Sequence, residues 1–196
     1  DYINGSFTAS KPLRIQYKDF SYWQKQQLAS PGIASQRKYW LDIFQNGAPI
    51  LELPADKTRP QTKSHNGETL HFAISPKMTE GINRFCKNED VTLFMFLLAS
   101  VKALLFRYTQ QDDITIGSPT AGREHFELEK QIGFYVNTLA LRTQFSGDDT
   151  FTTLAEKVKS TTLNAYQNQA FPFDKILEEI TLERDTSRAP LFDVAV

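Results

Sequence analysis

The longest apolar block of this 196-residue chain lies at residues 92–108 and limits the folds open to the chain. Large apolar side chains would cover most of the circumference of a helix here, so the helix needs burial on more than one side. These side chains are Phe94, Met95, Phe96, Leu97, Leu98, Val101, Leu104, Leu105 and Phe106. The uninterrupted run 93–99 is far shorter than the roughly 20 residues that span a bilayer. The segment is therefore predicted to be a core helix, and no membrane partner is expected.

The rest of the chain alternates helical and strand-like patterns. Helical spacing predicts helices over residues 17–29, 36–45, 76–88, 151–168 and 172–180. Alternation of apolar and polar residues, or short apolar runs, predicts strands over residues 67–74, 112–116, 135–142 and 191–196. Interspersed helices and strands favour an α/β domain with a mixed β-sheet packed by helices. Residues 1–16 lack periodicity and are interpreted as an extended connector.

Charge and cysteine content exclude several functional classes. Lys and Arg number 22 against 23 Asp and Glu, and no window holds a basic run, so no nucleic-acid partner is expected. Cys86 is the one cysteine, which excludes an internal disulfide or a cysteine-based zinc site and indicates a reducing, cytoplasmic location. The first residues show no basic region leading into an apolar stretch, so no signal peptide is expected.

Common catalytic and metal motifs are missing from the sequence. His65 and His71 are predicted to be surface residues, which leaves His125 as the other histidine that could serve a nucleophile. Cys86 is interpreted as a small buried hydrophobe. The acidic residues between 178 and 185 are interpreted as a solvated face, so no metal site is predicted.

One stretch stands out, at residues 116–123 together with residues 132–139. Two glycines and a proline directly after a predicted strand permit tight turns and leave the Ser118 hydroxyl and the Arg123 guanidinium near a strand end. Strand ends are places where functional sites collect. A structural ion pair to a carboxylate would explain Arg123 equally well, and a structural amide that satisfies backbone groups would explain Asn137.

These motifs and several others resemble the condensation domain of nonribosomal peptide synthetases. The matching stretches run in the family's order along essentially the whole chain. They are YKDFSYWQ at 17–24, Tyr39-Trp40 with LPADKTRP at 53–60, the GxPxAGR and IGxFVNT elements within 117–138, NQAFPFD at 168–174 and RDTSRAPLFD at 184–193. The chain departs from the family pattern at Tyr135, where Phe is usual, and at Asn168 and Ala170, which replace the His and Asp of HQDxPFE.

The resemblance implies a chloramphenicol acetyltransferase-like fold of two lobes, with residues 1–196 forming a partial condensation domain, mainly the C-terminal lobe. The family forms an amide when the amine of a carrier-bound aminoacyl thioester attacks an upstream acyl thioester. Its HHxxxDG motif belongs to the first lobe, and no His-His pair occurs in this sequence. We therefore expect no catalytic residue here and no activity from this fragment alone.

The resemblance also implies site residues and partners. Trp23, Ser118, Arg123 and Asn137 are expected to contact substrate in the tunnel between the lobes, with Arg123 alternatively bracing the missing histidine motif. The chain is expected to bind no cofactor, because carrier proteins supply the phosphopantetheine arms. Expected partners are the upstream and downstream peptidyl carrier domains, the adjacent adenylation domain and the missing N-terminal lobe. Without that lobe, exposed apolar surface predicts self-association of the fragment.

Three other functions remain to be weighed. An epimerisation domain shares the fold, but IGFYVNT at 132–138 argues against it, and RDTSRAPLFD argues against a free-standing acyltransferase that uses coenzyme A. A degenerate condensation-like module that only docks carriers or tailoring enzymes stays open, because Asn168 and Ala170 alter one motif. An intact upstream HHxxxDG would favour the enzyme, whereas aspartates there would indicate a heterocyclising variant.

Overall fold

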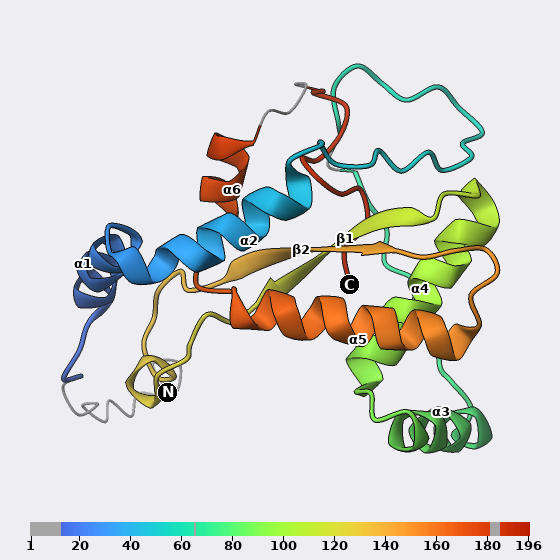
Figure 1. Cartoon of the computed structure of the whole chain (residues 1–196), viewed down its shortest axis with the longest axis horizontal. Coiled ribbons are helices and arrows are strands. Elements are labelled where there is room, and N and C mark those ends of the chain that lie inside the picture. Colours follow the sequence, from blue (N-terminus) through green and yellow to red (C-terminus); the bar gives the residue numbers. More distant parts are fainter. Residues whose placement is uncertain (1–12, 65, 181–184) are drawn as a thin grey trace, which may run out of the picture.

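The computed structural model describes residues 13–64, 66–180 and 185–196, in which helices surround a small sheet (Figure 1). The helices are α1 (Tyr17–Leu28), α2 (Ala34–Phe44), α3 (Pro76–Asn88), α4 (Leu93–Thr109), α5 (Phe151–Gln167) and α6 (Phe173–Glu179). The strands are β1 (Asp113–Thr120) and β2 (Asn137–Gln144), and the 3-10 turns are η1 (Pro31–Ile33) and η2 (Phe126–Leu128). The helices predicted from the sequence are confirmed within one or two residues at each end.

The sheet combines both kinds of strand pairing. β1 and β2 are antiparallel, with Asp113 opposite Gln144 and Thr120 opposite Asn137. On the other side of β1, the Gly117 backbone donates to the Val194 carbonyl and accepts from the Val196 amide, both at 2.9 Å, in a parallel bridge. The expected α/β fold, with a sheet packed by helices, is confirmed; the sheet itself is small and antiparallel, and the bridge at Gly117 is its parallel contact in the described residues.

Side-chain caps begin three of the helices. Ser75 accepts a hydrogen bond from the Met78 amide at the start of α3, and Pro76 occupies the first turn. Thr92 and Thr150 cap α4 and α5 in the same way. Each cap satisfies an amide that would otherwise lack a partner in the first helical turn, which explains why these helices begin where they do.

Two strand predictions are wrong. Residues 67–74 form an exposed, irregular segment in which the Phe72 side chain is 87% exposed. No strand among the described residues pairs with this segment, and an alternating pattern without a partner cannot form a ladder. The predicted strand at 191–196 is reduced to the single bridge at Ala195. Cys86 is half-buried rather than buried, because α3 lies at the edge of the core.

The core lies where α4 and α5 meet the sheet, and α5 runs alongside the strands in Figure 1. α4 buries Met95, Leu98, Ala99, Lys102 and Leu105. Its opposite face stays open, since Leu104 and Tyr108 are exposed, so the prediction of a helix buried nearly all round is only partly right. No single helix in the described ranges is long and apolar enough to cross a bilayer, although α3 and α4, bent by 104°, satisfy length and composition when taken together.

A fully buried lysine, not predicted from the sequence, ties α4 to both strands. The Lys102 amine donates to the Ile114 carbonyl at 2.7 Å and to the Leu141 carbonyl at 2.9 Å. Burial lowers the pKa of Lys102 to about 7, although the nearby Asp113 carboxylate acts in the opposite direction. A neutral amine has two N–H donors, which matches the two carbonyl acceptors.

This lysine predicts a pH-dependent stability. Between about pH 7 and pH 9 the unfolded chain keeps Lys102 protonated while the folded chain releases the proton. The free energy of unfolding should therefore rise with pH, by up to about 1.4 kcal/mol per pH unit. Lys102→Met should abolish this rise, as measured by urea unfolding at pH 7, 8 and 9. Equal pH slopes in the two proteins would contradict the assignment.

Candidate functional site

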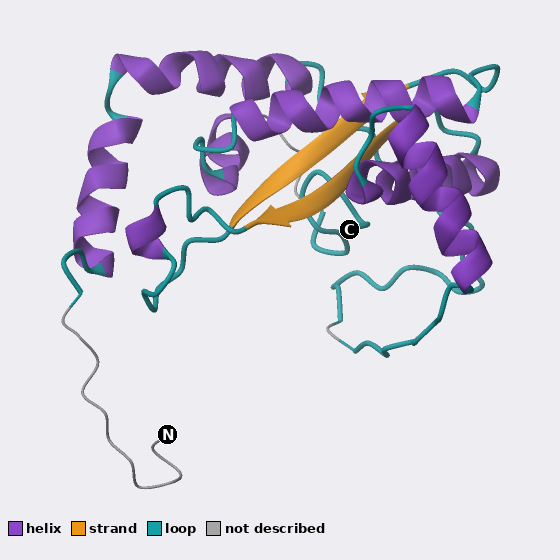
Figure 2. Ribbon diagram, turned by 90° about the horizontal axis from the view of Figure 1, so that it is seen from below, coloured by secondary structure: helices purple, strands orange, loops and turns teal. Residues whose placement is uncertain are grey.

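Three of the four predicted site residues belong to one hairpin. Residues 121–136, here called the hairpin loop, connect β1 to β2. Ser118 lies near the end of β1, Arg123 lies in the loop, and Asn137 begins β2. Both views of the molecule show α1, which carries Trp23, beside this loop (Figures 1 and 2). The structure therefore brings the four residues to the same end of the sheet.

Aromatic contacts join α1 to the hairpin loop. The Tyr135 ring is 4.7 Å from the Phe20 ring and 5.3 Å from the Tyr17 ring, measured between centroids. Phe20 in turn lies 5.8 Å from Trp23, whose side chain is 53% exposed. Tyr135 is 5% exposed, so it forms the buried centre of this cluster.

Arg123 packs on the same ring. Its guanidinium carbon lies 4.1 Å from the Tyr135 ring centre, a cation–π geometry, and the guanidinium also donates to the Leu128 carbonyl. Within the described ranges Arg123 forms no ion pair, so the structural pairing with a carboxylate considered from sequence is not seen there. Contact with substrate stays a prediction for both Arg123 and Trp23.

Asn137 uses its whole side-chain amide in the fold. Its nitrogen donates to the carbonyls of Gln169 and Phe171 at 2.8 and 3.1 Å. Its oxygen accepts from the amides of Thr138 and Phe173 at 2.9 and 3.0 Å. This geometry favours the structural amide and ties β2 to the connection between α5 and α6.

Ser118 lies inside the protein. It pairs with Leu139 in the ladder and is 6% exposed. It shares a sheet face with Thr120, whose hydroxyl donates to the Gln169 side-chain oxygen at 2.8 Å. A role of Ser118 in substrate binding stays a prediction.

The motif glycines are sites of close approach between motifs. A Cβ atom on Gly117 would overlap the Phe192 ring, and one on Gly133 would overlap the Tyr17 ring. Gly122 has φ +61°, and a Cβ there would overlap the Tyr135 carbonyl oxygen. Motifs far apart in the sequence therefore fit together through these glycines.

Residues 185–193, from the RDTSRAPLFD motif, bind the loop that follows α2. Arg188 donates to Asp193 at 2.6 Å and to the Leu51 carbonyl at 2.9 Å. The Thr186 hydroxyl donates to the Gln61 carbonyl at 2.6 Å, so residues 53–63 lie beside residues 185–193. Hydrogen bonds from Ser187 hold the pKa of Asp185 below its usual range. Arg184 of this motif, like His65, lies outside the described residues, whereas His71 is exposed as predicted.

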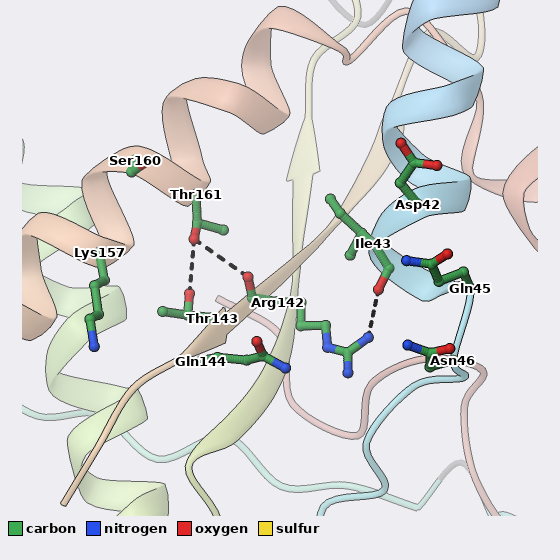
Figure 3. A pocket seen from close by; sticks show the side chains of 10 residues that line it. All are labelled: Asp42, Ile43, Gln45, Asn46, Arg142, Thr143, Gln144, Lys157, Ser160 and Thr161. Carbon is green, nitrogen blue, oxygen red and sulfur yellow. Dashed lines mark hydrogen bonds between the residues drawn. The ribbon is translucent and has the colours of Figure 1, made fainter.

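A polar pocket of about 480 Å³ lies away from the hairpin loop, between the end of α2, β2 and α5 (Figure 3). Its cations already have partners, since Arg142 pairs with Asp113 at 2.7 Å and Lys157 pairs with Asp149 at 2.6 Å. None of the four predicted site residues lines it. The part of the chain that the structure describes holds no group of three His, Cys, Asp or Glu side chains placed to bind a metal ion.

The sequence comparisons agree with the motif resemblance. The sequence model of the Condensation domain family matches residues 4–196. Bacitracin synthase 3 of Bacillus licheniformis is 46% identical over 182 residues, which are 93% of this chain and 3% of that protein. Surfactin synthase subunit 2 of Bacillus subtilis (strain 168) is 44% identical over 181 residues, which are 92% of this chain and 5% of that protein.

Solved structures share the fold. The X-domain from teicoplanin biosynthesis superposes with a TM-score of 0.88 at 25% identity, over 99% of this chain and 44% of that one. A four-domain nonribosomal peptide synthetase bound to AMP and glycine superposes with a TM-score of 0.84 at 24% identity, over 95% of this chain and 14% of that one. The chain thus spans less than half of the solved chains and a few per cent of the two synthases.

Proposed function

This chain belongs to the condensation domain family, and from that premise we propose that it supplies the second lobe of an amide-forming domain in a nonribosomal peptide synthetase. The chemistry joins two substrates held on carrier proteins. The amine of the acceptor attacks the donor thioester carbonyl, a C–N bond forms, the C–S bond breaks, and the carrier thiol leaves with the proton. We also propose that the protein is cytoplasmic.

The observation that carries the proposal is the gathering of the motif residues at one end of the sheet. Arg123 packs on Tyr135, and Tyr135 contacts Phe20, which in turn contacts Trp23. Asn137 anchors the end of the loop at the start of β2. We call Trp23, Phe20, Tyr135 and Arg123 the proposed tunnel wall, and its proposed role is to orient the two substrates. Holding two thioesters in a reactive arrangement lowers the barrier without a proton-transfer group from this chain.

Exposed apolar side chains on the hairpin loop support a first lobe as the covering partner. Ile132, Phe134 and Phe126 are 98%, 76% and 72% exposed, respectively. Apolar surface gathered on one loop indicates an interaction site. In the proposed two-lobed parent, a first lobe that carries HHxxxDG covers this loop and supplies the catalytic histidine.

The test is amide formation between two loaded carrier proteins. We expect product from the two-lobed parent and none from this chain alone, because the sequence has no His-His pair. In the parent, Arg123→Ala and Trp23→Ala should each lower the rate about tenfold or more through lost orientation. The exposed Tyr108→Phe in α4 serves as a surface control.

Product from the chain alone would contradict the proposed division between lobes. A folded parent that binds carriers and makes no amide would overturn the enzymatic proposal and favour the docking module. Amide formation can be followed by mass spectrometry of the carrier-bound product.

A further inference from the structure

Tyr135 and Gln131 form a buried hydrogen-bonded pair inside the hairpin loop. Both residues are 5% exposed. The Tyr135 hydroxyl donates to the Gln131 side-chain oxygen at 2.5 Å. The Gln131 nitrogen donates to the Ile15 carbonyl at 2.7 Å and to the Glu127 carbonyl at 3.1 Å. The pair therefore connects the chain just before α1 with two positions in the loop.

The same tyrosine links two residues of the proposed tunnel wall, Arg123 directly and Trp23 through Phe20. Its ring carries the Arg123 guanidinium and packs against Phe20, which contacts Trp23. Two further polar ties join the N-terminal segment and α1 to the loop, and both are exposed: the Arg14–Glu127 ion pair and the hydrogen bond that the Tyr17 hydroxyl donates to the Phe134 carbonyl at 3.1 Å. Exposed ion pairs contribute little because solvent screens them, whereas a buried hydrogen bond leaves a costly unpaired group when it is removed.

We propose that Tyr135 is a positioning residue whose hydroxyl bond to Gln131 fixes α1, and with it Trp23, relative to Arg123. The proposal rests on the proposed amide-forming function, since it assigns the orientation of that wall to one bond. The resemblance implies Phe at this position of the motif, so we expect the motif to fold without the hydroxyl. Tyr135→Phe removes the bond and keeps the ring.

The first test measures local order in this chain by hydrogen exchange. Tyr135→Phe should accelerate exchange about tenfold in residues 13–28 and 121–136 and leave α4 and α5 unchanged. Tyr39→Phe is the matched control, because Tyr39 is half-buried and its hydroxyl has no hydrogen-bond partner in the described ranges. Unchanged exchange in Tyr135→Phe, or equal acceleration throughout the chain, would overturn the proposal.

The second test measures kinetics in the two-lobed parent with loaded carriers. Tyr135→Phe should lower kcat about tenfold and change KM for the loaded acceptor carrier less than twofold, because orientation is lost while carrier docking is kept. Local loosening without a fall in kcat would overturn the positioning role. If the unmodified parent forms no amide, the proposed function fails, and the exchange measurement still decides whether the Tyr135–Gln131 bond orders α1 and the loop.

Discussion

Gly122→Ala is expected to destabilise the chain by about 3 kcal/mol or more. Gly122 has a positive φ, which costs any other residue roughly 1–2 kcal/mol. The new Cβ would also overlap the Tyr135 carbonyl oxygen, a backbone atom that cannot turn away as a side chain can. The backbone at Gly122 and at Tyr135 must then move apart, which loosens the cluster around Arg123. Urea unfolding of the variant chain measures this loss.

Gly47→Ala provides the matched control. Gly47 also has a positive φ, +80°, but a Cβ there meets nothing within 4 Å. Its cost should be limited to that of the backbone conformation, roughly 1–2 kcal/mol. Equal destabilisation in the two variants would show that the close approach of Gly122 to Tyr135 contributes nothing.

Asn137→Ala is expected to cost about 2–4 kcal/mol. The change leaves the Gln169 and Phe171 carbonyls and the Phe173 amide without their partner at Asn137. Unsatisfied buried groups cost more than the net value of the bonds that are lost. Thermal and urea unfolding should both show the loss.

Asn168→Ala tests the same chemistry at a half-buried position nearby, whose hydrogen bond is exposed. The Asn168 side chain makes one exposed bond, to the Asn164 carbonyl at 2.8 Å. Its removal should change stability by about 0.5 kcal/mol or less. If Asn137→Ala were equally mild, the amide would not be a structural tie, and its assignment to substrate contact would gain weight.

The helices could be predicted because their signals are local. The Ser75 and Thr92 caps and the apolar spacing act within a few turns, so the sequence defines them without tertiary context. The strand predicted at 67–74 is absent because strand formation depends on more than the local pattern. Its alternating residues satisfy the local pattern, but a strand also needs a partner, and none lies beside it in the described residues.

The candidate site was predictable as a set of motifs but not as a set of contacts. The position of Arg123 near a strand end followed from the glycines around it, whereas its packing on Tyr135 depends on a residue 12 positions away in the sequence. Gln131 carries no motif signal, although it directly precedes the IGFYVNT element, in which Tyr135 departs from the family's usual Phe. The burial of Lys102 could not be predicted from the apolar helix that contains it, because the carbonyl groups that accept its hydrogen bonds lie on two strands.

The yield of amide product from two loaded carriers, compared between the two-lobed parent and this chain alone, decides whether this chain is an orienting lobe. We expect product from the parent, a marked loss in Arg123→Ala of the parent, and no product from the chain alone. Product from the chain alone, or full activity in both Arg123→Ala and Trp23→Ala, would contradict the account of this chain as the orienting lobe.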